Sequence, residues 1–242
     1  MSVPDHLVQL TSMGGAASDM LEAYTTLGFL AAHTSRVRLF ALVSPPNFRY
    51  AGVLAKSVAT VDVLSGGRAW LGLGAGSASD EVESAAMGVP CPPVRERFVD
   101  VEDVLRACLR LWRDEVSAPR PLTAPHPPIL IAGDGERHTL RLVARYADAC
   151  GLIPGPEIAR KLDVLRRHCE AEGRDYAAIA KTVNLTIDVG RDGSRTRELV
   201  AQLRELHELG VDTVFGREVA HVETLVPLAA IGRDVIPEVA GW

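Results

Sequence analysis

Short apolar segments rich in β-branched residues alternate with longer amphipathic segments along almost the whole chain of 242 residues. Apolar residues at helical spacing predict helices over 20–35, 50–65, 94–115, 136–147, 157–173, 194–210 and 222–239. Continuous apolar runs predict strands over 36–44, 68–76, 127–133, 148–153, 181–189 and 211–216. We expect Ser18 or Asp19 to cap the first helix and Gly66–Gly67 to end the second.

This alternation indicates an α/β protein whose strands are joined by right-handed crossovers into a parallel sheet. Six strand-then-helix units follow a strand stub at the N-terminus, so about seven strands are expected. A TIM (β/α)8 barrel needs eight strands, and a doubly wound open sheet fits the alternation as well. The proline-rich stretch 118–128 reads as a loop, because the alternation continues beyond it, and residues 1–242 are therefore predicted to form a single domain.

Composition narrows the classes of partner. The net charge is −5 without a basic cluster, which argues against nucleic acid as a partner. No run of 18 apolar residues and no signal-peptide pattern is found, so neither a membrane span nor secretion is expected. The four cysteines are isolated and histidines lack metal-ligand spacing, which predicts reduced thiols, a cytoplasmic location and no metal.

Function in either fold gathers at the carboxyl ends of the strands. Those ends carry Asp5–His6, Ser44 and two glycine turns, 74–77 and 132–135. The first turn reads G-x-G-x-G and not the G-x-G-x-x-G of a dinucleotide site, so a plain tight turn remains open for it. The second turn opens a helix, so the N–H groups of 133–136 could cradle a phosphate, or Asp134 could simply cap that helix. His6 is either a proton carrier or a structural residue.

Several stretches together resemble the luciferase-like monooxygenase superfamily, and within it the coenzyme F420-dependent branch. They are "LEAYTTLGFLAAHTSRVRLFALVSPPNFRYAGVLAKSVATVDVLSGGRAWLGLGAG", "GVPCPPVRERFVDVEDVLRACLRLW", "PPILIAGDGERHTLRLVARYAD" and "ELGVDTV". The resemblance implies a TIM barrel with insertions, a homodimer, and a pocket for F420 or FMN at the carboxyl ends of the strands. It also implies hydride transfer where F420 is used and oxygen activation where FMN is used.

The resemblance assigns roles to individual residues. Asp5 and His6 would lie beside the deazaflavin and the substrate as the catalytic pair. The next strand end would carry a bulge with a non-proline cis peptide, around Val43–Ser44. The remaining cofactor contacts would come from the two glycine turns: Gly74, Ala75, Gly76 and Ser77 lining the ring, and Ala132, Gly133, Asp134 and Gly135 holding the phosphate.

The chain also departs from the family. Ser77 stands where F420-dependent members carry an acid or an aromatic residue, which leaves the substrate open. The family's first strand, first helix and most of its second strand are absent before Asp5–His6, so the barrel is expected to be incomplete. A start assigned too late, a fragment or a degenerate relative would each explain this. Substrate specificity is expected from loops 77–93 and 114–128.

These observations favour an oxidoreductase that transfers hydride between F420 and a small organic substrate. An FMN-dependent monooxygenase of the same superfamily is the first alternative. A non-catalytic ligand-binding or dimer-forming remnant of the fold is the second.

Overall fold

The computed structural model of the chain describes residues 1–10, 14–76, 80–114, 118–219 and 223–242. Its strands are β1 (Ser2–Val3), β2 (Phe40–Ala41), β3 (Leu71–Gly74), β4 (Ile129–Ala132), β5 (Ala149–Leu152), β6 (Ala180–Ile187) and β7 (Thr213–Val219). Its α-helices are α1 (Ala23–His33), α2 (Ala51–Ser65), α3 (Asp80–Met87), α4 (Val94–Arg113), α5 (Thr139–Tyr146), α6 (Ile158–Glu172), α7 (Thr196–Glu208), α8 (Val226–Ala230) and α9 (Ile236–Val239). Short 3-10 turns lie at Gly15–Ala17 and Tyr176–Ala178, and a π-helical turn, Ile231–Val235, joins α8 to α9.

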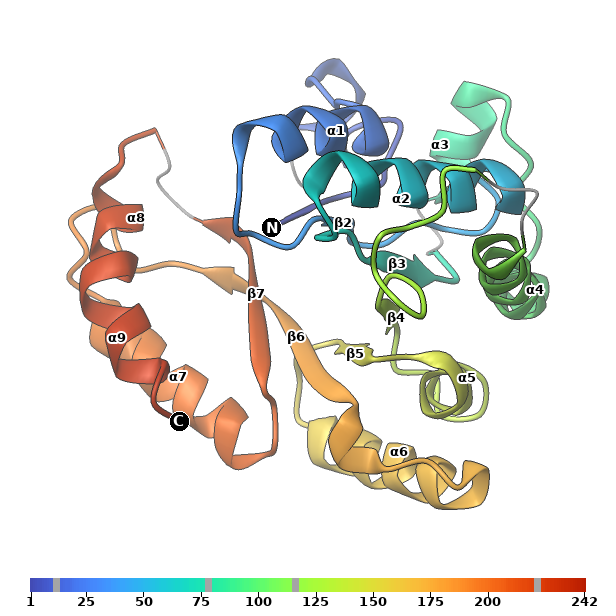
Figure 1. Ribbon diagram of the computed structural model, residues 1–242. Coiled ribbons are helices and arrows are strands. Elements are labelled where there is room, and N and C mark those ends of the chain that lie inside the picture. Colours follow the sequence, from blue (N-terminus) through green and yellow to red (C-terminus); the bar gives the residue numbers. More distant parts are fainter. Residues whose placement is uncertain (11–13, 77–79, 115–117, 220–222) are drawn as a thin grey trace.

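The strands pair in their sequence order, and every pair is parallel. β3 to β7 form one five-stranded sheet, and β1 pairs with β2. Single bridges from Leu39 to Ala69 and from Ser44 to Leu73 join β2 to β3, so the two sheets form one curved surface (Figure 1). An α/β protein with a parallel sheet, as the alternation predicted, is therefore confirmed.

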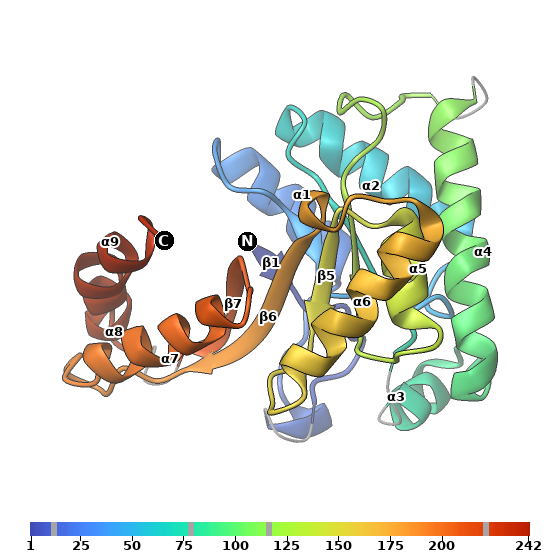
Figure 2. The ribbon, with the colours of Figure 1, turned by 90° about the horizontal axis from the view of Figure 1, so that it is seen from below.

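The helices cover the outer side of this surface, as Figure 2 shows for α4, α5 and α6. Residues on the strands, such as Leu71, Leu73 and Ile129, are fully buried, as are Leu54 of α2 and Leu105 of α4. Burial from both sides explains why these strands are continuous apolar runs and not alternating ones. The resulting core extends from α1 to α7.

The sheet does not close into a barrel within the residues that the structure describes. β1 and β7 are its two edges, and no ladder pairs one with the other. Side chains nevertheless meet across the concave side, where the ring of Phe215 from β7 lies edge-on to that of Phe40 from β2, with centroids 5.3 Å apart. The rings of Phe40 and Phe215 thus fill part of the concave side of the sheet.

Several predicted boundaries were wrong. Glu22 and not Ser18 or Asp19 caps α1, by accepting a hydrogen bond from the Thr25 N–H at 2.7 Å. The strand predicted over 36–44 pairs as a ladder over Phe40–Ala41 alone, and the helix predicted over 222–239 is interrupted by the π-helical turn. The predicted stop at Gly66 is confirmed, since this residue is left-handed with φ 69°.

The loop before β4 lies far from the carboxyl ends of the strands. Its described part, 118–128, docks on α2, where the buried Asp62 carboxylate accepts hydrogen bonds from the N–H groups of Leu122 and Thr123 at 2.7 and 2.9 Å. In Figure 2 this segment crosses the end of the molecule opposite to α3. The expectation that 114–128 shapes the substrate site was therefore wrong for 118–128, because the segment precedes a strand and sits at its amino end.

Among the described residues, no helix combines the length and the apolar character needed to cross a membrane.

Candidate active site at the carboxyl ends of the strands

A cavity of about 380 Å³ opens at the carboxyl ends of β3 to β6. It contains six of the predicted cofactor residues: Val43, Gly74, Ala75, Gly76, Ala132 and Gly133. The sequence analysis missed the other six lining residues, which are Gly151, Leu152, Ile153, Pro154, Asn184 and Thr186. Its volume falls within the range of small-molecule sites in proteins.

Glycine at position 74 is required by close packing. A Cβ there would lie 2.7 Å from Cγ2 of Val43, which lines the same cavity. The Leu42–Val43 peptide is cis, one residue before the place that the resemblance implied. Bare backbone at 74, and likewise at 133 and 151, leaves a flat surface on the wall of the cavity.

Asn184 lies in the middle of β6, and its Oδ1 atom is buried without a hydrogen-bond partner. The residue lines the cavity. A buried acceptor without a partner is rare in native proteins, and such atoms are found at ligand sites. The signal that could have revealed it is an amide in the apolar run "KTVNLTIDV", which otherwise reads as a buried strand.

The second glycine turn lies at the edge of the cavity. Gly133 has φ 121° and donates its N–H to the carbonyl of Gly151 at 2.8 Å, so that N–H is already engaged. No acceptor is found among the described residues for the N–H groups of Asp134, Gly135 and Glu136. Asp134 and Gly135 do not line the cavity itself.

The helix after this turn begins later than predicted, at Thr139, and Asp134 does not cap it. A cation faces the turn instead. Nζ of Lys161 donates to the carbonyl of Asp134 at 3.0 Å and lies 3.2 Å from Oε1 of Glu136. Sequence reasoning missed Lys161, which lies 27 residues away along the chain.

Asp5 is the centre of a buried polar network and does not line the cavity. The residue is 2% exposed, and Oδ2 accepts hydrogen bonds from Ser44 Oγ at 2.5 Å and from Arg49 at 2.7 Å. The Tyr24 hydroxyl lies 3.0 Å from Ser44 Oγ, and Arg49 also pairs with Glu22 at 2.5 Å. Five side chains thus tie the ends of β1 and β2 to α1 and to the segment before α2.

The charges of this network perturb its titrating groups. Burial raises the pKa of the Tyr24 hydroxyl. Burial would lower the pKa of Arg49, but the neighbouring Asp5 carboxylate outweighs it, and that pKa is raised. For Glu22, burial is outweighed by hydrogen bonds from Thr25 and Arg49, which lower its pKa to about 2.

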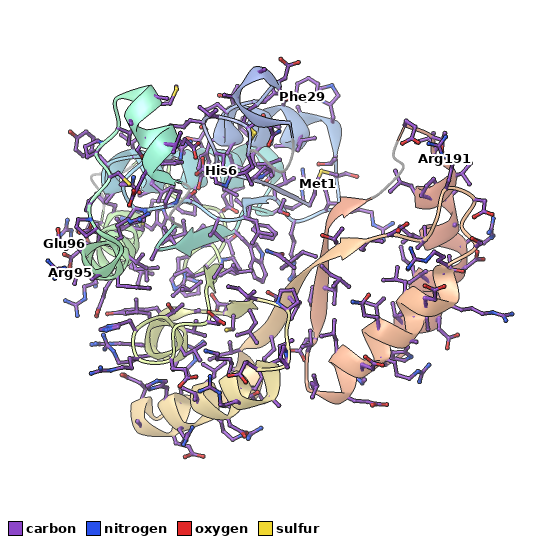
Figure 3. The ribbon with its side chains drawn as sticks, turned by 180° about the vertical axis from the view of Figure 1, so that it is seen from behind. Met1, His6, Phe29, Arg95, Glu96 and Arg191 are labelled. Atoms are coloured by element: carbon purple, nitrogen blue, oxygen red, sulfur yellow. The ribbon has the colours of Figure 1, made fainter. Side chains whose placement is uncertain are left out.

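His6 faces α3 and not the cavity lining (Figure 3). Its Nδ1 lies 2.8 Å from Oε2 of Glu83, a carboxylate that is 6% exposed. Asp5 and His6 come just after β1, behind Pro4, so both belong to the same edge of the sheet as the glycine turns. The structure therefore brings the predicted residues to one edge, but it separates the Asp5–His6 pair from the cavity lining.

Ser77 lies outside the described residues. The described histidine, cysteine and acidic side chains form no group of three or more that could hold a metal ion.

Similarity to known proteins settles the family. The luciferase-like monooxygenase family model matches residues 3–225. The chain belongs to this family. An F420-dependent glucose-6-phosphate dehydrogenase from Kineococcus radiotolerans is 30% identical over 213 residues, which cover 81% of the chain and 61% of that protein. The chain thus spans about three fifths of the length of this relative.

Solved structures share the fold at low identity. An F420-dependent secondary alcohol dehydrogenase in complex with an F420–acetone adduct has a TM-score of 0.81 at 15% identity, over 98% of this chain and 89% of that one. The oxygenating component of 3,6-diketocamphane monooxygenase from Pseudomonas putida, in complex with FMN, has a TM-score of 0.67 at 14% identity, over 99% and 88% of the two chains.

Proposed function

We propose that this luciferase-like protein is an F420-dependent oxidoreductase that moves hydride between the deazaflavin and the hydroxyl- or carbonyl-bearing carbon of a small organic substrate. The observation that carries the proposal is the glycine-walled cavity with the unpartnered Asn184 Oδ1, in a chain 30% identical to an F420-dependent dehydrogenase. His6, on the strand end that Asp5 fixes, would supply the acid–base chemistry beside it.

The residues present fit the cofactor. A flat ring can lie on the bare backbone of Gly74, Gly133 and Gly151, and Asn184 Oδ1 can accept from a ring N–H. The free N–H groups of 134–136 and Lys161 can hold a phosphate, as helix-entry turns do. Ala132, Gly133, Asp134 and Gly135 thus remain our proposed phosphate turn, while Val43, Gly74, Ala75, Gly76 and Ser77 remain the proposed ring contacts. Ser44 is buried against Asp5, so its part would be to support these contacts.

When bound, F420 would supply the group that carries the hydride, and with it two electrons. His6 would hydrogen-bond a substrate oxygen and accept or return its proton, a task that suits an imidazole near neutral pH. Asp5 is enclosed by Ser44 and Arg49, so its part is to fix the strand end that carries His6. This division of labour refines the expectation that both residues act on the substrate.

We also propose that residues 1–242 form one domain with the architecture of a TIM-type barrel. The parallel strand order and the curvature of the sheet support this. A cytoplasmic location accords with the four free thiols. We propose a homodimer as well.

An FMN-dependent monooxygenase is the second candidate, because a fold neighbour holds FMN. Titrating the purified protein separately with F420 and FMN distinguishes the candidates. Micromolar binding of F420 without FMN binding supports the proposal, the reverse supports the alternative, and binding of neither supports a non-catalytic remnant.

Turnover is the second readout. With F420 bound, the deazaflavin absorbance is followed on adding glucose 6-phosphate or 2-propanol, which represent the sugar phosphate and secondary alcohol classes of the two F420-dependent relatives. Bleaching with either one supports hydride transfer to F420 and assigns the substrate class. Binding of F420 without bleaching by these or by a wider panel of alcohols would overturn the enzymatic proposal.

A further inference from the structure

Glu83 is an unusual residue on α3. Its neighbour Val82 is 78% exposed, yet the Glu83 carboxylate is 6% exposed and reaches the segment after β1. Oε2 lies 2.8 Å from His6 Nδ1, while Oε1 accepts hydrogen bonds from the N–H of Val8, at 3.0 Å, and from the N–H of Leu7. One carboxylate therefore holds both the ring and the backbone that follows it.

The hydrogen-bond donors around the Glu83 carboxylate determine which nitrogen of the His6 ring carries the proton. Peptide N–H groups can only donate, so the oxygen that binds Leu7 and Val8 acts as an acceptor. An ionised carboxylate has no proton to offer, so the hydrogen between Oε2 and Nδ1 belongs to the imidazole. The neutral ring then carries its proton on Nδ1 and a lone pair on Nε2.

The other ring nitrogen is available. Among the described residues no group bonds His6 Nε2, and the His6 side chain is 24% exposed. A lone pair on Nε2 can accept a hydrogen bond from a substrate hydroxyl, whereas an N–H at that atom could not.

We propose that Glu83 is a positioning residue for His6, which fixes the Nδ1–H tautomer and keeps Nε2 as the acceptor that meets the substrate. The assignment of the tautomer stands on the geometry alone. Its consequence for turnover rests on the proposed function, in which His6 contacts the substrate oxygen.

The helix has contacts other than those of Glu83. Ser84 beside it is 1% exposed, and the Asn47 side-chain amide lies 3.5 Å from Ser84 Oγ and donates to the carbonyl of Pro90 at 2.9 Å. Glu83→Gln is nearly isosteric, and its amide oxygen can still accept from Leu7 and Val8. The amide NH2 would then face Nδ1, and the ring would move its proton to Nε2.

The test uses long-range proton–nitrogen NMR correlations of histidine-labelled protein without any cofactor. His6 is assigned by the loss of its signals in His6→Gln. We expect the Nδ1–H tautomer in the wild type, the Nε2–H tautomer in Glu83→Gln, and no change in the control Glu81→Gln, which alters an exposed carboxylate on the same helix. An Nε2–H tautomer in the wild type, or the same tautomer in Glu83→Gln, would overturn the proposal.

Turnover gives the second readout. With F420 and whichever of glucose 6-phosphate and 2-propanol is oxidised, Glu83→Gln should lower kcat about 100-fold with a small change in KM, as loss of a positioned base does. In a His6→Gln background the same substitution should have no further effect on kcat.

The outcomes separate the two hypotheses. A further drop in kcat in the His6→Gln background means that Glu83 acts otherwise than through His6, and this contradicts the positioning role. If the tautomers behave as expected but His6→Gln turns over normally, the proposed role of His6 fails while the Glu83 assignment stands.

Discussion

Asn184 is the residue at which stability and function conflict most clearly. An unpaired buried acceptor costs the folded state roughly 1–3 kcal/mol. Proteins keep such atoms where a ligand satisfies them, and in this chain the residue that carries the atom is one of those lining the cavity of the proposed F420 site. Asp5 differs in part: its Oδ1 is also buried without a partner, but its Oδ2 is paired with Arg49, and the residue serves the structure of the site.

This contrast predicts a trade-off for Asn184→Leu. Removing the unpaired amide at constant volume should raise the free energy of unfolding by about 1 kcal/mol, because nothing inside the protein loses a partner. The affinity for F420 should fall about tenfold, which corresponds to one hydrogen bond. Urea unfolding and F420 titration measure the two quantities on the same samples, and a variant that is less stable than the wild type would contradict the interpretation.

At the scale of elements, the strands were easier to predict than the helix starts. A strand covered by helices must be apolar throughout, and β3, β4 and β5 each fell within a predicted run, while β6 begins one residue before its predicted run. The start of α1 depends instead on Glu22, whose carboxylate is held by Arg49 from 27 residues further on. No local pattern reports such a contact, and Ser18 and Asp19 were the stronger local signals.

Helix α3 was missed for a related reason. Its buried residues include Glu83 and Ser84, both polar, so the apolar spacing that predicts a helix is weak there. Glu83 and Lys161 were not predicted as site residues, because each reaches the site through a contact with a residue far away in the sequence. Two residues of the stretch that resembles the family, Asp62 and Arg68, have structural contacts. Asp62 binds the loop at Leu122, and Arg68 binds the carbonyl of Thr34 at the end of α1. These residues of the resemblance therefore stabilise the scaffold.

The cap of α1 gives a pH-dependent prediction. The pKa of Glu22 falls from 4.5 to about 2 on folding, so the ionised form stabilises the native state above pH 4.5, and this stabilisation is lost as the pH falls toward 2. Glu22→Gln should therefore be less stable than the wild type near neutral pH, by about 1 kcal/mol, since the side chain is 40% exposed and its charges are screened.

The difference between the two proteins should shrink below pH 4.5 and vanish near pH 2. Urea unfolding of both proteins at several pH values between 2 and 7 measures it. A constant difference across this range would mean that the ionised carboxylate contributes nothing through Arg49 or Thr25.

At the scale of the whole molecule, one outer surface carries several large apolar side chains that are exposed. We call it the α1–α2 face and define it by the exposed side chains Leu21, Phe29, Tyr50, Val53 and Leu64, which are 54–88% exposed. A groove of about 660 Å³ runs between the two helices, and the small residues Gly28 and Gly52 lie along it. Figure 3 places Phe29 on the outer side of α1.

This face has the composition expected of an interface between two copies of the chain. Apolar residues on the outside of a helix indicate that something covers it. Lys56 is the one charged groove residue outside the Glu22–Arg49 pair, so two copies related by a two-fold axis would meet with little repulsion. Protruding Phe29 and the glycine-lined groove lie on the same face, which makes it self-complementary.

Phe29→Lys tests this surface. We expect the wild type to sediment at twice the mass of one chain, because exposed aromatic side chains at the centre of an interface carry much of its energy. Phe29→Lys should sediment as a monomer, since it would place a charge within an apolar contact.

Leu225→Lys is the matched control: Leu225 is 77% exposed just before α8, away from the face, and its substitution should leave the dimer intact. Sedimentation equilibrium at several concentrations gives the mass, and circular dichroism establishes that both variants are folded. A dimer that persists in Phe29→Lys, or a wild type that is monomeric at micromolar concentration, would exclude the α1–α2 face as the dimer interface.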